Sequence, residues 1–232
     1  MTSFSPSTAQ RGSSLVIILI AVALFAALTY AISKSSNSGK NLSQEQTRLF
    51  ASEIIDSGNR FSETISRMKL AGVMEADISF EYNGNYVNGA CTIDDCMVFN
   101  FNGGGLEWDT APTGSTSGDD WIFTSGISID GIGTTDNDLV AILPRVNESV
   151  CHRINVLIDI ETEADATPVS ASGINADGFT GSYTSGAPTT ISSAKTIAKR
   201  SGCVLVASMA SDMLATSPVS QPRVYYQVLI AR

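Results

Sequence analysis

The stretch Leu15–Ile32 reads LVIILIAVALFAALTYAI and carries no charged side chain. A helix rises 1.5 Å per residue, so this run would extend about 27 Å, close to the hydrocarbon thickness of a bilayer. A helix at the surface of a globular core shows one polar face, whereas this run is apolar on every side. The sequence therefore predicts a transmembrane helix over residues 13–32.

Three fates of this apolar segment stay open. A secretory signal peptide would place Arg11 before the run and a small-residue cleavage site at Thr29-Tyr30-Ala31. Its apolar region usually spans only about 7–15 residues, which is shorter than this run. A signal anchor would keep the whole segment, and a processed leader would lose only the residues before it. Basic residues flank the run on both sides, so charge alone does not fix its orientation.

The tripeptide Gln10-Arg11-Gly12, followed by Ser13 and the apolar run, resembles the leader of type IV pilins and type II secretion pseudopilins. The resemblance implies a leader over residues 1–12, cleavage by prepilin peptidase between Gly12 and Ser13, and N-methylation of Ser13. Most family members have Glu at the fifth residue after the cut, where this chain has Ile17. That Glu neutralises a neighbour's terminal amine inside the apolar filament core, where an unpaired charge is costly. Tip pseudopilins commonly lack it, so the resemblance implies a minor or tip subunit.

The resemblance also implies partners and a location. Other pilin or pseudopilin subunits would bind through the N-terminal helix, and prepilin peptidase would process the leader. The inner membrane of a bacterium would hold the subunit as a single-pass protein. The head would then lie in the periplasm or, within a filament, on the cell surface.

A stem is predicted over residues 33–72. Ser43-Gln44-Glu45-Gln46 has the pattern of a capping box, and apolar residues then recur at helical spacing as far as Leu70. Gly58 should weaken this helix by about 1 kcal/mol relative to Ala. We expect the transmembrane and amphipathic halves to form one long N-terminal helix, with the amphipathic half packed on the head. An ordinary membrane protein with a juxtamembrane helix is the alternative.

The head is predicted over residues 73–232 and gives the chain an α+β fold class. Aromatic and β-branched residues bounded by turn residues predict four strands. One helix is expected around residues 146–158, with Asn147 as its N-cap. Residues 161–195 are rich in Ser, Thr, Gly and Ala and predict a long loop with weak strands. The four predicted strands cover residues 78–86, 97–101, 121–129 and 224–230.

Charge is distributed unevenly along the chain, whose formal net charge is −9. Residues 1–72 hold seven basic and four acidic side chains, whereas residues 73–232 hold seven basic and nineteen acidic ones. An acidic head repels phosphate backbones, so nucleic acid is not expected as a partner. Solubility of an exported domain is a sufficient explanation of this acidity.

The four cysteines predict two disulfides in a head outside the cytoplasm. Three pairings are possible, and we favour Cys91 with Cys96 and Cys151 with Cys203. The second bridge closes the longer loop and should contribute more to stability. Zinc is the weaker interpretation, because no CxxC pair exists and the single histidine, His152, follows Cys151 without metal spacing.

No residue pattern predicts catalysis, so the chain is not expected to be an enzyme and no cofactor is expected. His152 would have to act as the base of any Ser–His–Asp set, and no GxSxG motif is present. Asp130, Asp136 and Asp138 lie in a Gly-punctuated stretch that could supply oxygen ligands to calcium. The stretch does not match the EF-hand pattern, and a hairpin turn is favoured over a calcium loop.

These observations predict a structural subunit of a type IV pilus-like or pseudopilus filament, minor or located at the tip. Its apolar helices would bundle, and its head would contact neighbouring heads or cap the filament. The alternative is a membrane-anchored or secreted binding or adhesion module, whose loops over residues 161–195 would contact the partner. The filament, the cargo and any ligand are not specified by the residues.

Overall fold

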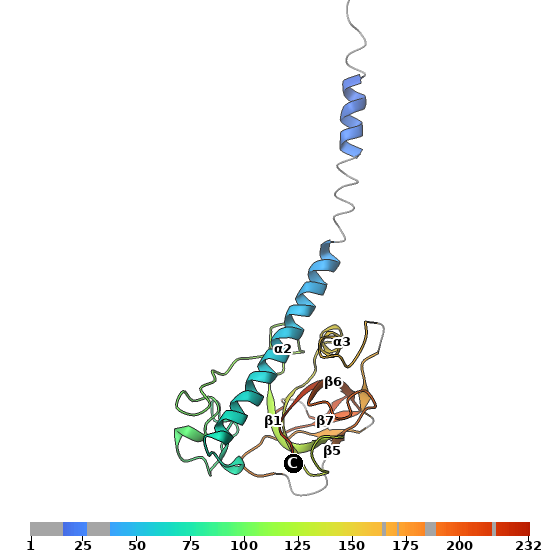
Figure 1. The fold of residues 1–232 in the computed structure, drawn as a ribbon. Coiled ribbons are helices and arrows are strands. Elements are labelled where there is room, and N and C mark those ends of the chain that lie inside the picture. Colours follow the sequence, from blue (N-terminus) through green and yellow to red (C-terminus); the bar gives the residue numbers. More distant parts are fainter. Residues whose placement is uncertain (1–15, 27–37, 164–165, 171, 184–188, 215–216) are drawn as a thin grey trace, which may run out of the picture. The chain divides into compact units, whose positions relative to one another are not determined.

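The structure is a computed structural model that describes residues 16–26, 38–163, 166–170, 172–183, 189–214 and 217–232 (Figure 1). The chain divides into two compact units, residues 1–45 and residues 46–232. The first unit contains a helix over residues 16–26 and the start of the next helix. The second unit is the head, an α+β domain with two helices and two sheets among its described residues.

The head is built from one long helix, one short helix and nine strands in its described residues. The helices are α2 (Ser38–Leu70), which begins in the first unit, and α3 (Glu148–Leu157), with 3-10 turns at Glu75–Asp77 and Asp94–Cys96. The strands are β1 (Ile122–Ile129), β2 (Asp138–Leu143), β3 (Val169–Ser170), β4 (Ile174–Asn175), β5 (Thr189–Ile191), β6 (Ser201–Val206), β7 (Ser208–Ala210), β8 (Val219–Ser220) and β9 (Arg223–Ile230).

A six-stranded sheet with the order β3-β6-β9-β2-β1-β5 forms the centre of the head. Its four inner strands pair antiparallel, and the short edge strands β3 and β5 pair parallel to their neighbours. A second sheet has the order β4-β7-β8. The helices α2 and α3 pack on one face of the large sheet, and side chains of the small sheet pack on the other (Figure 1).

Strand β2 shows how burial on both faces affects the sequence of a central strand. All six of its residues are buried. Leu139, Ala141 and Leu143 face a core shared with α2 and α3, whereas Val140 and Ile142 face a core shared with β4 and β7. A strand covered on both faces needs apolar residues at every position, so it loses the alternation typical of a half-exposed strand.

Helix α2 packs on the large sheet through a single apolar stripe. Ala51, Ile54 and Ile65 are fully buried in the helix-side core. Gly58 lies where the helix approaches β9 closely, because a Cβ at this position would lie 2.5 Å from the hydroxyl oxygen of Tyr225. The helix ends as predicted near Gly72, whose φ of 100° is favourable for glycine. Its start at Ser38 differs from the predicted capping box at Ser43.

Helix α3 is tied to the sheet by a disulfide and by hydrogen bonds. Cys151 on α3 is bonded to Cys203 on β6. The buried Asn155 side chain donates to the Cys203 carbonyl at 2.7 Å and accepts from the Cys203 amide at 2.8 Å. Asn147 occupies the predicted N-cap position, but its side chain makes no capping bond and donates instead to the Gly114 carbonyl at 2.5 Å.

The predicted long N-terminal helix is wrong. The first described helix has 11 residues, 16–26, and α2 is a separate helix that begins at Ser38. No single helix in the described residues joins the apolar run to the stem. Residues 13–15 and 27–37 lie outside the described part of the chain.

The predicted single-pass location in the inner membrane is corrected for the same reason. Eleven helical residues extend about 16 Å, roughly half of the hydrocarbon thickness of a bilayer. Among the residues that the structure describes, no helix has the length and apolar character needed to cross a membrane.

Two of the four predicted strands are confirmed, as β1 and β9. Residues 78–86 and 97–101 form no strand and are joined only by a parallel bridge between Ser79 and Met97. An Asn83-Gly84 turn interrupts the first of these segments, since the backbones of Tyr82 and Asn85 hydrogen bond across it. The weak strands expected within residues 161–195 are present as β3, β4 and β5.

Candidate functional site

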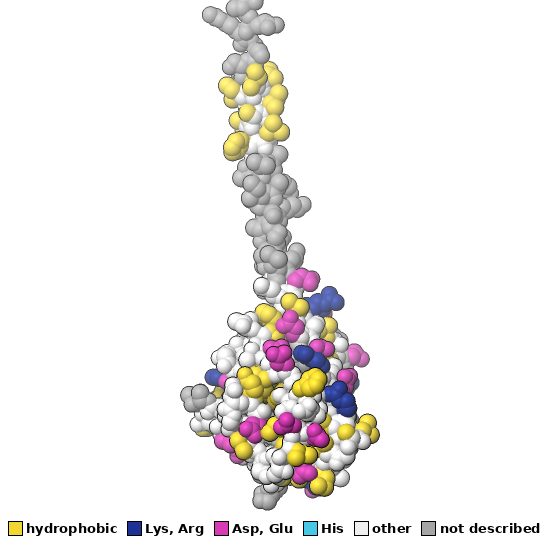
Figure 2. Space-filling view, turned by 90° about the vertical axis from the view of Figure 1, so that its left-hand side faces the viewer, with side chains coloured by type: hydrophobic (Ala, Val, Ile, Leu, Met, Phe, Trp, Pro, Cys, Tyr) yellow, Lys and Arg dark blue, Asp and Glu magenta, His cyan; other side chains and the backbone are white. Residues whose placement is uncertain are grey.

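The helix over residues 16–26 exposes its apolar side chains almost uniformly. Its sequence, VIILIAVALFA, contains no polar residue. Side chains on all sides of this short helix are more than half exposed, and the visible face in Figure 2 is covered with hydrophobic groups. Contiguous apolar surface of this kind marks a binding surface in most proteins. The exposed fractions include Val16 55%, Ile17 62%, Ile18 60%, Leu19 64%, Ile20 55%, Val22 63% and Leu24 66%.

The structure does not describe the processing residues implied by the pilin resemblance. Gly12 and Ser13 lie outside the described residues. Ile17, which stands where most pilins have Glu, lies in the first turn of the helix over residues 16–26 and is exposed. The described helix thus begins on uncharged, β-branched residues.

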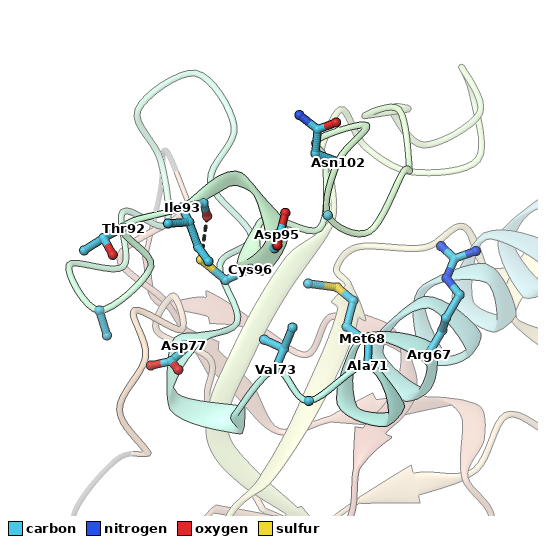
Figure 3. A pocket seen from close by; sticks show the side chains of 13 residues that line it. Arg67, Met68, Ala71, Val73, Asp77, Thr92, Ile93, Asp95, Cys96 and Asn102 are labelled. Carbon is cyan, nitrogen blue, oxygen red and sulfur yellow. Dashed lines mark hydrogen bonds between the residues drawn. The ribbon is translucent and has the colours of Figure 1, made fainter.

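A cavity of about 560 Å³ lies in the head between the end of α2 and the loop closed by Cys91 and Cys96. Figure 3 shows Arg67 and Met68 of α2 and Ala71 just after it on one side, and the residues of the disulfide loop opposite them. Apolar and polar side chains share the lining, which includes Val73, Asp77, Thr92, Ile93, Asp95 and Asn102.

Hydrogen bonds and an ion pair fix the positions of the charged side chains around this cavity. Arg67 donates a hydrogen bond to the Gly104 carbonyl, and Lys69 contacts Glu75 at 2.5 Å. Tyr183 also donates to Glu75, at 3.2 Å. Although partial burial would raise the pKa of the Glu75 carboxyl, these donors hold that pKa below its usual range. The lining of the cavity offers the carboxylates of Asp77 and Asp95 and the guanidinium of Arg67, but no histidine.

Both favoured disulfide pairings are confirmed. Cys91 is bonded to Cys96, and Cys151 is bonded to Cys203. The first closes a loop at the edge of the cavity, with Ile93 exposed in it, and the second joins α3 to β6 inside the helix-side core. All four cysteines are therefore used in the architecture of the head.

Two of the three candidate calcium ligands, Asp130 and Asp138, have partners of their own. Asp130 accepts a hydrogen bond from the Ser192 hydroxyl at 2.7 Å. Asp138 is buried and accepts from the backbone amides of Ile129 and Arg232, each at 3.0 Å, and burial raises the pKa of its carboxyl. Asp136 is exposed. Within the described residues, no group of three or more His, Cys, Asp or Glu side chains is placed to hold a metal ion.

His152 lies on α3 beside two glutamates. Its Nδ1 is 2.9 Å from Oε2 of Glu161, whose side chain is fully buried, and its Nε2 is 4.0 Å from Glu163. Arg153 forms an ion pair with Glu163 as well. The partly buried imidazole is therefore held by the carboxylates of two glutamates.

Comparison of the chain with protein-family models, with curated proteins and with solved structures gave no match. Sequence reasoning found the apolar run, the cysteines and the aspartates, but it missed the cavity at the end of α2. The predicted end of the helix near Gly72 was a signal for one wall of that cavity. The opposite wall comes from a disulfide loop about twenty residues further on, and no periodic pattern announces it.

Proposed function

We propose that this chain is a structural subunit of a type IV pilus-like or pseudopilus filament and that it occupies a minor or tip position. The observation that carries the proposal is the exposed apolar helix over residues 16–26. Through this helix the subunit would associate with the corresponding helices of other subunits.

The helix needs a partner because of its length and composition. Isolated helices shorter than about 12–15 residues are marginal in water, and this helix has 11. Five of its first seven residues are β-branched, which lowers helix propensity further. Packing against other apolar helices would remove its side chains from water at about 25 cal/mol per Å² of buried apolar surface. The stabilisation would therefore come from association rather than from the helix itself.

The head supports the proposal by supplying its own core. The stripe of α2 that contacts the sheet is buried, and the large sheet is covered on both faces. Figure 2 shows acidic and basic side chains scattered over the visible face of the head among the hydrophobic ones. Association through residues 16–26 would thus leave a folded head available for contacts with neighbouring heads.

The minor or tip position rests on the residue at position 17, where this chain has Ile instead of the Glu of most pilins. A terminal amine buried in a filament core needs a compensating carboxylate. Ile17 cannot supply it, so this subunit would not neutralise the amine of a neighbour. A subunit at the end of a filament has one neighbour fewer and does not need that carboxylate.

The processing step gives the first test. The full chain is expressed together with a prepilin peptidase, and its intact mass is measured. The expected product begins at Ser13 and carries one additional methyl group, and Gly12→Leu blocks the cleavage. A product that begins at Met1, or one cut near Ala31, would contradict the proposal.

A further inference from the structure

A second cavity, of about 320 Å³, lies on the head and takes no part in the proposed assembly. Its volume is at the small end of the range found for ligand pockets, about 300–1,000 Å³. Five separate chain segments meet around it. Its lining includes Tyr82, Asn85, Tyr86, Trp108, Asp119, Asp120, Trp121, Arg145, Met213 and Leu214.

Unusual backbone conformations are concentrated at this cavity. Tyr86 and Arg145, both in its lining, have φ values of 57° and 48°. Such values are uncommon for residues other than glycine and are most unusual for bulky side chains. Asn83 and Gly84, with φ values of 50° and 80°, form the tight turn that precedes Tyr86. Strain of this kind often accompanies binding sites, because the surrounding fold must impose it.

A stack of two aromatic rings lies at the cavity. Tyr82 and Trp108 stack with their centroids 4.5 Å apart and their planes at 9°. Phe99 supports Trp108 edge-on, with a centroid distance of 5.0 Å. Tyr82 and Trp108 are both half-buried, so the stack is anchored in the core and still reaches the surface.

The charged groups of the lining are one ion pair and one further carboxylate, that of Asp120. Arg145 donates two hydrogen bonds to the Asp119 carboxylate, which neutralises both charges. Asp120 accepts from the backbone amides of Trp121 at 2.8 Å and Ala111 at 3.3 Å, so its carboxylate is occupied by the loop. An anionic ligand would be repelled by the Asp120 carboxylate, whereas a neutral ligand would leave both this carboxylate and the Asp119–Arg145 pair undisturbed.

Two groups at the cavity retain hydrogen-bonding capacity. The Asn85 amide is exposed, and neither this amide nor the Tyr82 hydroxyl bonds to another group in the described residues. The face of an aromatic ring favours a ligand with an apolar face. The Asn85 amide, the Tyr82 hydroxyl and the Asp119–Arg145 ion pair favour a ligand that carries many hydroxyl groups. A pyranose ring combines an apolar C–H face with a rim of hydroxyl groups.

We propose that this cavity binds a neutral saccharide of one or two rings, with one sugar face against the outer side of the Tyr82–Trp108 stack and its hydroxyls toward Asn85 and the Asp119–Arg145 pair. The proposal does not depend on the filament function. It assigns a small-molecule site to the surface formed by the turn over residues 82–86 and the segment over residues 118–122.

Tryptophan fluorescence of the full chain tests the proposal. The chain contains two tryptophans, Trp108 and Trp121, and both line this cavity. The methyl glycosides of glucose, galactose, mannose and N-acetylglucosamine are titrated to about 20 mM, which covers weak binding with a Kd in the millimolar range. We expect a saturable change in fluorescence with at least one of the four. No saturable change with any of them would overturn the proposal.

Two variants and a control locate the binding. Tyr82→Ala should weaken it by about tenfold, the scale of one aromatic contact, and Asn85→Ala by about fivefold, the scale of one hydrogen bond. Phe101→Ala removes a ring that is 93% exposed and does not line the cavity, so its affinity should equal that of the wild type. Because Asn85 is exposed, its variant should fold even if Tyr82→Ala does not. Unchanged affinity in Asn85→Ala would overturn the proposed site.

Discussion

The helix over residues 16–26 and helix α2 place their apolar residues in opposite ways. The first exposes apolar side chains around its whole circumference, whereas α2 buries one stripe on the large sheet and turns charged residues outward. A stripe can be covered by the chain's own sheet. A helix that is apolar on every side requires partners on several sides. The head therefore buries its apolar stripe within one chain, whereas the apolar side chains of the helix over residues 16–26 stay exposed.

The largest expected effect comes from placing charges on the exposed apolar helix over residues 16–26. Leu19→Asp with Leu24→Asp places two charges among the apolar side chains of the first helix, where an unpaired charge is costly once buried. We expect these changes to abolish association of the chain, measured by sedimentation velocity, and to leave the melting temperature of the head unchanged. Oligomers that persist in the doubly substituted chain would contradict the proposed assembly.

The two disulfides should differ in their effect on the head. The bridge between Cys151 and Cys203 spans 52 residues, and the one between Cys91 and Cys96 spans 5. Loop-closure entropy predicts that removing the first with two alanines lowers the free energy of unfolding by about 4 kcal/mol, and removing the second by about 2 kcal/mol. Urea denaturation measures both. A larger loss from the short loop would show that the chain-entropy account does not apply.

Gly58 tests how tightly α2 is packed. Helix propensity alone would predict that Gly58→Ala stabilises the protein by about 1 kcal/mol. The added Cβ would meet the hydroxyl of the buried Tyr225, so we expect destabilisation of about 1–3 kcal/mol instead. Adding Tyr225→Phe, which removes that hydroxyl, should recover part of the loss. A stabilising Gly58→Ala would mean that the helix lies further from β9.

The smallest expected effect is a pH dependence. Burial raises the pKa of the Asp120 carboxyl, so the folded protein binds this proton more tightly than the unfolded chain does. The associated stability is present below the ordinary pKa of aspartate and is lost as the pH rises through the raised pKa. Wild type should therefore lose stability relative to Asp120→Asn between about pH 4 and neutrality. A difference in unfolding free energy that is constant over this range would refute the assignment.

Helices and strands could be predicted from the sequence where the local residue pattern matches the burial that the fold gives that segment. The stripe of α2, the apolar face of α3 and strands β1 and β9 could be predicted because each has a clear spacing or a clear β-branched run. Strand β2 was missed, although its residues Asp138–Leu143 are almost all apolar. Its burial on both faces removes the alternation by which a strand is usually recognised.

Tertiary packing decided the remaining cases. The predicted strand over residues 78–86 is broken by the Asn83-Gly84 turn and by the positive φ of Tyr86. The predicted strand over residues 97–101 leads into a glycine-rich turn, where the Gly104 amide donates to the Met97 carbonyl at 2.8 Å. The cavity beside Tyr82 could not be predicted, because its lining comes from segments more than a hundred residues apart.

Cross-linking at the centre of the first helix tests the central claim most directly. All four native cysteines are in disulfides, so Ala23→Cys introduces a single free thiol. If helices over residues 16–26 of different copies pack together, mild oxidation should convert the chain into a covalent dimer. The dimer should disappear when Leu19→Asp and Leu24→Asp are added. A chain that stays monomeric under oxidation at concentrations where it is associated would contradict the account.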